Sequence, residues 1–202
     1  MSGLRTARKA QTRQRIIAAA MDVYAEQGFA APTSAVAERA EVSHGSVFAH
    51  FGSSDELLDA TVESFSAAVG LDLHTLSEAG DDIAELLSLH LDVLADHEPF
   101  YRRLVKESAQ LPESTRHALV AMNSTVSFHF WRALEADIAS GRVKDLPFHL
   151  IFNTWLGLVH YYLLNDDLFA PDGQVLAHHK NALVACFTTL IETQTTPRKA
   201  PK

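Results

Sequence analysis

Apolar residues recur every three or four positions along most of this sequence, which is the pattern of amphipathic α-helices. No stretch shows the regular apolar–polar alternation that indicates a β-strand. The pattern predicts nine helices, at about residues 8–27, 33–40, 44–51, 53–70, 82–97, 99–105, 112–139, 147–164 and 174–192. A loop is predicted over residues 166–173. We therefore expect an all-α fold.

The predicted helices fall into two groups. Residues 8–52 hold three helices that form an N-terminal domain, and residues 53–70 form a connecting helix. Residues 71–194 form a larger helical bundle. The two ends of the chain, residues 1–7 and 195–202, have low hydrophobicity and are expected to be disordered.

The stretch 33–51 reads as two short helices joined by a tight turn. Ala37 lies where the second helix must cross the first closely, and only a small side chain fits there. Thr33 and Ser43 are predicted to cap the two helices, because their hydroxyls can accept from free N–H groups of the first turn. This arrangement predicts a helix-turn-helix, whose second helix reads the major groove of DNA.

The predicted inward residues of the second helix are Val47 and Phe51, so its other side chains face outward. We expect polar contacts from that helix to bases or phosphates, with only an apolar contact from Phe48. The start of the preceding helix is expected to bind a phosphate. The candidate DNA-binding residues are Thr33, Ser34, Ser43, His44, Ser46, Phe48 and His50.

Residues from about Arg8 to Leu58 resemble the N-terminal domain of the TetR family of transcriptional regulators. The resemblance includes a first helix that ends in Gly28-Phe29 and an acidic-Leu-Leu start of a fourth helix. Its other matching positions are Thr33, Val36-Ala37, Ala40, Val42-Ser43, Gly45 and the Phe-x-His-Phe run at 48–51. Beyond about residue 70, family members share architecture more than sequence.

Three residues depart from the family pattern. Glu41 stands where Gly is usual, and a left-handed turn conformation costs a non-Gly residue about 1 kcal/mol. Phe48 stands where Tyr is usual, so the phosphate contact of that hydroxyl is missing. Ser54 stands where Lys is common, which removes a further phosphate contact. Together these departures favour weaker anchoring on the DNA backbone than in a typical member.

The resemblance implies a small, usually apolar ligand between the helices of the second domain. The candidate ligand-binding residues are His90, Tyr101, Leu104, Met122, Val126, Phe130, Trp155 and Val159. Polar tips among apolar walls suit such a pocket. Taken one by one, the same positions also fit an ordinary hydrophobic core, and both interpretations stay open.

The helices predicted at 147–164 and 174–192 are apolar over too much of their circumference for a monomer. An exposed apolar stripe of that size marks an interface. The residues that cannot all face the core are Phe148, Phe152, Leu156 and Tyr162. The resemblance implies a two-fold homodimer in which each chain contributes these two helices to a four-helix bundle.

The net charge of the chain is −8, which is unusual for a protein that binds DNA. Its distribution resolves much of this conflict. Residues 1–52 carry six basic and four acidic residues, a net charge of +2, whereas the rest carries eleven basic and twenty-one acidic residues. A basic N-terminal end on an acidic body suits one face to phosphates and repels DNA elsewhere.

Other chemistry has no support in the sequence. None of the eleven histidines are spaced as metal ligands on a helix, and no phosphate-binding glycine loop or nucleophile elbow is present. We expect no enzyme activity, metal or cofactor. Cys186 sits in an apolar run and is expected to be buried. The most apolar stretch, 147–164, is interrupted by polar residues, so we expect no membrane span and a cytoplasmic location.

The sequence thus predicts a homodimeric transcriptional regulator, in particular a repressor that a small, mainly apolar ligand releases from a double-stranded DNA operator. The alternative is a ligand-binding helical protein whose helix-turn-helix no longer binds DNA. The departures at Glu41, Phe48 and Ser54 keep that alternative open.

Overall fold

The computed structural model describes residues 2–77, 82–171 and 173–193. In these residues the protein is helical, with a single antiparallel bridge between Val143 and Glu192 and no longer strand. The helices are α1 (Ser2–Gln27), α2 (Thr33–Arg39), α3 (His44–His50), α4 (Ser54–Ser77), α5 (Ile83–Ala95), α6 (Glu98–Glu107), α7 (Glu113–Ala139), α8 (Phe148–Leu164), α9 (Asp166–Phe169) and α10 (Val175–Ile191). The predicted all-α fold is confirmed.

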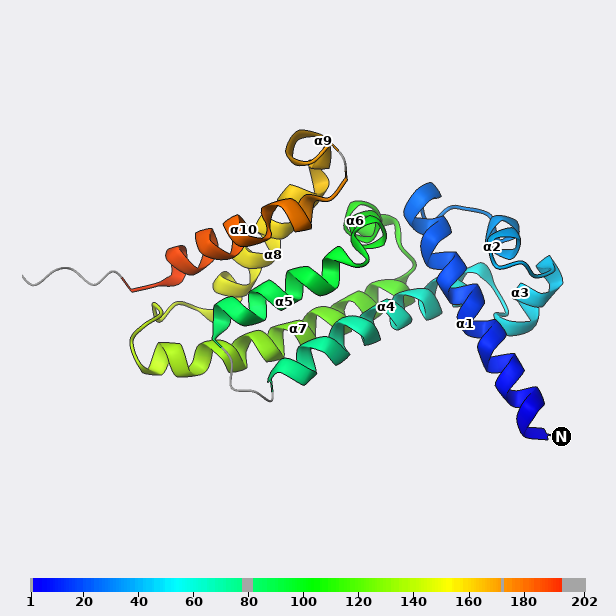
Figure 1. Ribbon diagram of the computed structural model, residues 1–202, viewed down its shortest axis with the longest axis horizontal. Helices are drawn as coiled ribbons and strands as arrows, with labels where there is room; N and C mark the ends of the chain where they lie inside the picture. Colours follow the sequence, from blue (N-terminus) through cyan, green and yellow to red (C-terminus); the bar gives the residue numbers. More distant parts are fainter. Residues whose placement is uncertain (1, 78–81, 172, 194–202) are drawn as a thin grey trace, which may run out of the picture.

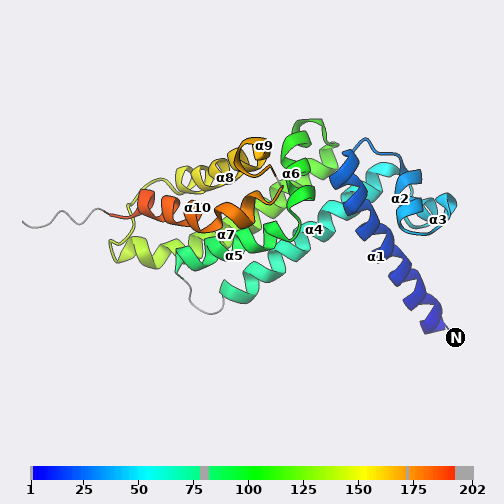
Figure 2. The same ribbon diagram turned by 45° about the horizontal axis from the view of Figure 1, so that its top comes forward.

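The helices gather at the two ends of an elongated molecule. Figure 1 shows α1, α2 and α3 at one end and α5, α7, α8 and α10 forming a bundle at the other. The long helix α4 runs from the small group into the bundle, where it lies alongside α7 in both views (Figure 2). Short α6 lies at the junction and packs against α1.

A chain of aromatic rings joins the two groups of helices. The ring centroid of Phe29, just after α1, lies 5.9 Å from that of Phe100 in α6. The centroid of Phe100 lies 5.4 Å from that of Phe65 in α4, which in turn lies 5.7 Å from the centroid of Tyr101. Phe65 and Phe100 are fully buried, so these rings close the junction with apolar packing.

Several predicted bounds are wrong. The first helix begins at Ser2, so residues 2–7 are helical rather than disordered. Leu4, Arg5 and Ala7 are good helix formers, and no proline interrupts this stretch. The fourth helix continues through Gly70 to Ser77, and the predicted loop 166–173 contains the single turn α9. Residues 78–81, inside the predicted second domain, and residues 195–202 lie outside the described residues.

The helix caps agree with the sequence at one of the two predicted positions. The Ser43 hydroxyl accepts a hydrogen bond from the N–H of Ser46 at 3.1 Å and caps α3, as predicted. The Thr33 cap is wrong, because Thr33 is already the first residue of α2 and Pro32 occupies the cap position. Glu41 has φ = 53°, so the turn does place a non-Gly residue in the left-handed region.

The face of α8 that was predicted to lie at an interface lies inward. Phe152 is only 8% exposed, and its ring centroid lies 5.5 Å from that of Phe130. The other three predicted residues, Phe148, Leu156 and Tyr162, are half-buried against the same core. The exposed apolar residues of α8 are instead Leu150, Tyr161 and Leu164. The prediction for Cys186 is also wrong, because this residue is exposed on α10.

Candidate functional site

The packing of α2 against α3 produces the helix-turn-helix. Val36 and Ala37 of α2 and Val47 of α3 are buried, together with Phe51 directly after α3. Ala37, which was predicted to lie at the crossing of the two helices, is 4% exposed. These contacts turn the opposite side of α3 to solvent.

The seven predicted DNA-contacting residues lie at the surface of this motif, to different degrees. Ser34, Ser43, His44 and Phe48 are exposed, with Phe48 at 43%. Thr33, Ser46 and His50 are half-buried. All seven therefore belong to one end of the molecule, and their DNA contacts stay a prediction.

Two of these residues are bound to each other. Thr33 Oγ1 and His44 Nε2 lie 2.8 Å apart, which links the start of α2 to the start of α3. The ring of His44 also meets the ring of Phe48 edge to face, at 5.0 Å. These contacts fix the position of the His44 ring at the surface of the motif.

The end of α3 is surrounded by cations that the candidate list did not contain. Burial lowers the pKa of His50, and the charges of Lys9 and Arg13 lower that pKa further. The Arg13 guanidinium lies over the ring of Phe51, 4.9 Å from its centroid. The spacing of Lys9 and Arg13, one helical turn apart, was the signal in the sequence that both share the face beside α3.

Arg39, the basic residue of α2, is held by acidic partners. Its guanidinium donates to both carboxylate oxygens of Glu26, at 3.0 and 2.6 Å, and lies 3.8 Å from Asp22. Hydrogen bonds from Arg39 lower the pKa of Glu26. The cations turned toward α3 therefore come from the first part of α1.

The eight predicted ligand-binding residues are all buried in the bundle. One hydrogen-bonded pair lies among them, and a second joins one of them to His160, which the sequence did not indicate. Trp155 Nε1 donates to His90 Nδ1 at 3.1 Å, and the hydroxyl of Tyr101 lies 2.7 Å from Nε2 of His160. Burial lowers the pKa of His90 to about 4 and raises the pKa of Tyr101. These polar groups are neutral at physiological pH and hydrogen-bonded inside an apolar core.

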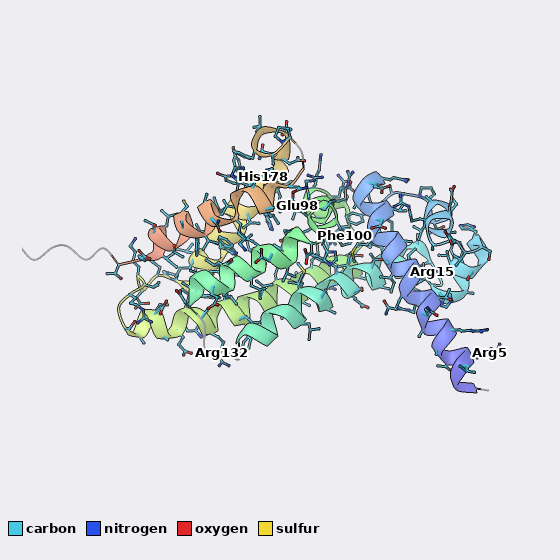
Figure 3. All side chains as sticks on the ribbon, in the orientation of Figure 1. Arg5, Arg15, Glu98, Phe100, Arg132 and His178 are labelled. Atoms are coloured by element: carbon cyan, nitrogen blue, oxygen red, sulfur yellow. The ribbon has the colours of Figure 1, made fainter. Side chains whose placement is uncertain are left out.

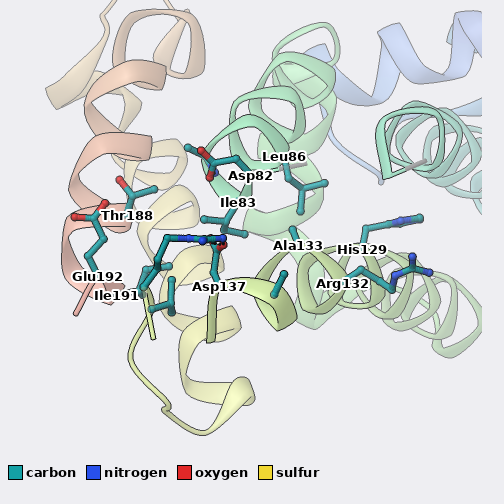
Figure 4. A pocket seen from close by; sticks show the side chains of 14 residues that line it. Asp82, Ile83, Leu86, His129, Arg132, Ala133, Asp137, Thr188, Ile191 and Glu192 are labelled. Carbon is teal, nitrogen blue, oxygen red and sulfur yellow. Dashed lines mark hydrogen bonds and ion pairs between the residues drawn. The ribbon is translucent and has the colours of Figure 1, made fainter. Parts of the chain in front are cut away.

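A cavity of about 680 Å³ lies elsewhere in the bundle (Figure 4), formed by α5, α7 and α10, which lie at the end of the molecule opposite α3 (Figure 1). It opens between the start of α5, the second half of α7 and the end of α10. Ile83, Ala133 and Ile191 contribute apolar surface, and the ion pair of Asp137 and Arg142 lies at its edge. None of the eight predicted residues lines it, because helix ends that are distant in sequence form it.

Short α6 holds both parts of the molecule through carboxylates near its two ends. Buried Glu98 accepts hydrogen bonds from the N–H groups of Val175 and Leu176 at 2.9 and 2.8 Å and so caps α10. Figure 3 places Glu98 and Phe100 at this junction. Glu107 accepts from the N–H of Phe29 at 3.1 Å. At Gly28 (φ = 86°) a Cβ atom would lie 2.9 Å from Oε1 of Glu107.

Known proteins with similar sequences also contain a helix-turn-helix. Residues 16–61 match the family model described as bacterial regulatory proteins, tetR family. The HTH-type transcriptional repressor Rv3405c of Mycobacterium tuberculosis and the regulator Mb3439c of Mycobacterium bovis are each 43% identical over 82 residues. Each match covers 40% of this chain and 43% of the length of the relative.

Solved structures extend the agreement in fold to nearly the whole chain. A TetR-family regulator from Agrobacterium tumefaciens has a TM-score of 0.76 at 18% identity, over 92% of this chain and 100% of its own. FadR from Bacillus subtilis, solved with stearoyl-CoA, has a TM-score of 0.74 at 19% identity, over 89% and 99%. NemR from E. coli has a TM-score of 0.71 at 19% identity, over 92% and 100%.

These relatives are transcriptional regulators, and nothing in the comparisons points to catalysis. Among the described residues, no helix is long and apolar enough to cross a membrane. The helix-turn-helix geometry, the matching family model and the related mycobacterial regulators agree with one another. Residues 16–61 therefore form a domain that is similar to the DNA-binding domain of the TetR family of bacterial regulatory proteins.

Proposed function

We propose that this protein is a homodimeric repressor that binds an operator through α3 and is released from it by a small, mainly apolar ligand. The observation that carries the proposal is the exposed polar face of α3, beside cations of α1, on a chain whose remainder is strongly acidic. That distribution directs one end of the molecule to DNA.

Selection of bound sequences from a random pool of duplex DNA tests the operator contact. The selected duplex should show a base preference, and His44→Ala should weaken its binding by about 1–3 kcal/mol, the range for one base contact. His117→Ala, an exposed histidine on α7, is the matched control and should leave binding unchanged. A folded wild type that enriches no sequence would favour the alternative function, a ligand-binding protein that no longer reads DNA.

The dimer is proposed to form through α8 and α10. The exposed apolar residues Leu150, Tyr161 and Leu164 share one face of α8. The exposed side of α10 carries small residues, which allow a second helix to approach closely. These small exposed residues are Ala182, Ala185, Cys186 and Thr189. Both faces together are the surface that a second copy of the chain would cover.

Sedimentation tests this interface. Tyr161→Glu combined with Leu164→Glu places two charges on the exposed face of α8 and should yield folded monomers that no longer bind the operator. Val120→Glu adds a charge to an exposed apolar position of α7 and should leave the dimer intact. A wild type that sediments as a monomer at micromolar concentration would refute the dimer.

We propose that the effector binds in the core around Tyr101 and Trp155, where buried polar groups can orient an otherwise apolar molecule. The related FadR structure holds stearoyl-CoA, so this fold can accommodate a long apolar ligand. The 680 Å³ cavity near Ala133 is the second candidate, because it is already open.

Two variants distinguish these positions, with stearoyl-CoA as the first probe. Trp131→Phe leaves Trp155 as the only indole, so its fluorescence reports binding in the core. Tyr101→Ala should weaken the ability of the effector to release the protein from the operator. Ala133→Leu, which fills the distal cavity, should leave that release unchanged. The opposite result would assign the effector to the distal cavity.

A further inference from the structure

The first part of α1 projects from the molecule without packing against it. Residues 3–11 are all exposed, and the buried positions of α1 begin at Ile16. Figures 1 and 2 both show this segment extending away from α2 and α3. At 1.5 Å per residue, ten helical residues reach about 15 Å beyond the domain. Residues 2–13 are called the basic arm below.

The charge of the basic arm has one sign. Arg5, Lys9 and Arg13 follow one another at successive turns of a single face, and Arg8 lies beside them. The first acidic residue of the chain is Asp22. Like charges one turn apart destabilise a helix, and a helix that does not pack is marginal in water. The arm therefore lacks, within the described part of this chain, the anions that would neutralise it.

The arm lies on the side of the molecule that carries α3. The Arg13 guanidinium lies over Phe51, directly after α3, and Lys9 and Arg13 act on the titration of His50 at the end of α3. Figure 3 shows Arg5 near the tip of α1 and Arg15 nearer to the domain. The basic face therefore continues outward from the end of the helix that is proposed to read DNA.

The chemistry of the arm points to phosphates rather than to lipid. Its one large apolar residue is Leu4, so the arm has no apolar face to insert into a membrane. A regular row of cations on a rigid support matches a regular row of phosphates, and each neutralised phosphate releases counterions.

We propose that the basic arm lies as a helix along the phosphate backbone of DNA, beside the major groove that α3 enters, and so lengthens the contact without reading sequence. This inference rests on the proposed DNA-binding function. It assigns to Arg5, Arg8 and Lys9 contacts to phosphates that do not depend on the operator sequence.

The salt dependence of binding tests the charges. The probe is a mixed-sequence duplex of about 40 base pairs, and its anisotropy is followed between about 50 and 200 mM salt. Arg5→Gln combined with Lys9→Gln should reduce the slope of log affinity against log salt by about 2 per chain. Each single change should reduce it by about 1, while Arg116→Gln, an exposed arginine of α7, should leave it unchanged.

A second pair of variants tests whether the arm must be helical. Ala10→Pro keeps every charge but breaks the helix, because proline lacks the N–H and clashes with the preceding turn. It should weaken binding several-fold and shorten the protected segment in a hydroxyl-radical footprint on the selected operator. Ala10→Gln preserves the helix and should behave like the wild type.

The outcomes distinguish a failure of the proposed arm contacts from a failure of the proposed DNA-binding function. A wild type that binds no duplex would overturn both proposals. A wild type that binds, with an unchanged salt slope for Arg5→Gln/Lys9→Gln, would overturn the arm alone. The arm would also be overturned if these variants lost binding to anionic phosphatidylserine vesicles while keeping the DNA slope.

Discussion

The DNA-binding domain and the helical body differ in what they bury. The buried residues of α1–α3 are apolar, apart from the hydroxyl of Tyr24. The buried polar residues of the described chain all lie in α4–α7, and they are Thr61, His90, Glu98, Thr115 and His129. Several of them make hydrogen bonds to other helices. Glu98 binds the start of α10, His90 accepts from Trp155, and Thr115 donates to Asp59.

This difference in buried groups shows that the two regions are stabilised in different ways. Apolar packing holds the small domain together and places its polar side chains at the surface. Buried hydrogen bonds in the body fix which helices lie together, because a polar group that loses its partner in a low-dielectric interior is costly. Breaking one such bond should therefore disturb the body more than any single change disturbs the surface of the small domain.

The largest expected effect follows from removing the carboxylate that caps α10. Glu98→Ala leaves the buried N–H groups of Val175 and Leu176 without their acceptor, which should lower the free energy of unfolding by about 3 kcal/mol. Glu98→Gln keeps one acceptor and should cost less. Urea denaturation followed by circular dichroism measures both.

The control for this prediction is Glu113→Ala, which removes an exposed carboxylate from the first turn of α7. Its cost should stay within about 1 kcal/mol. Equal losses for the two alanine variants would show that burial at the start of α10 has no special importance, and the contrast between the two regions would fail.

A smaller effect should appear on acidification. The pKa of His90 is about 4 in the folded protein, against 6.5 for an exposed histidine, so the unfolded chain binds a proton first as the pH falls. Stability is therefore full above about pH 6.5 and declines below it, by about 2 kcal/mol at pH 5 from this residue. His90→Gln should lose less stability than the wild type between pH 7.5 and pH 5.

Thermal melts at both pH values measure that difference, with His117→Gln on the surface of α7 as the matched change. The surface variant should keep the pH dependence of the wild type. If His90→Gln lost as much stability on acidification as the wild type, another group would cause the acid sensitivity of the body.

The smallest effect should be a gain in the small domain. Glu41 holds φ = 53°, a conformation that Gly adopts at little cost, so Glu41→Gly should stabilise the protein by about 1 kcal/mol. Glu38→Gly, inside α2, should destabilise it by a similar amount, because Gly weakens a helix interior. The midpoint of thermal unfolding should rise for Glu41→Gly and fall for Glu38→Gly. Shifts of both midpoints in the same direction would contradict the strain at the turn.

Local patterns predicted the small domain better than the body. Ala37, Ser43 and Val47 act through neighbours within a few positions, so their spacing already indicates their roles. Thr33 shows the limit of this reasoning, because its hydroxyl suited a cap but α2 already includes Thr33, and Pro32 occupies the cap position without a side-chain hydrogen bond. The DNA contacts themselves stay predictions.

The body depends on contacts that spacing alone does not reveal. Glu98 and Val175 are 77 positions apart, and nothing in either segment indicates that they meet. Helix α8 is apolar on nearly every side, so its periodicity could not show that Phe152 faces inward and Tyr161 outward. The eight predicted ligand residues were correctly placed in the interior, but the open cavity lies between helix ends that no periodic pattern marks.

The exposed Cys186 provides a way to measure how fast the proposed dimer dissociates. This thiol is the only one in the chain, and it lies among the small residues on the face of α10 that a second copy would cover. In a dimer it reacts with a thiol reagent only while the two chains are apart. The rate at which a dilute solution consumes such a reagent, once it no longer depends on reagent concentration, is the dissociation rate of the assembly.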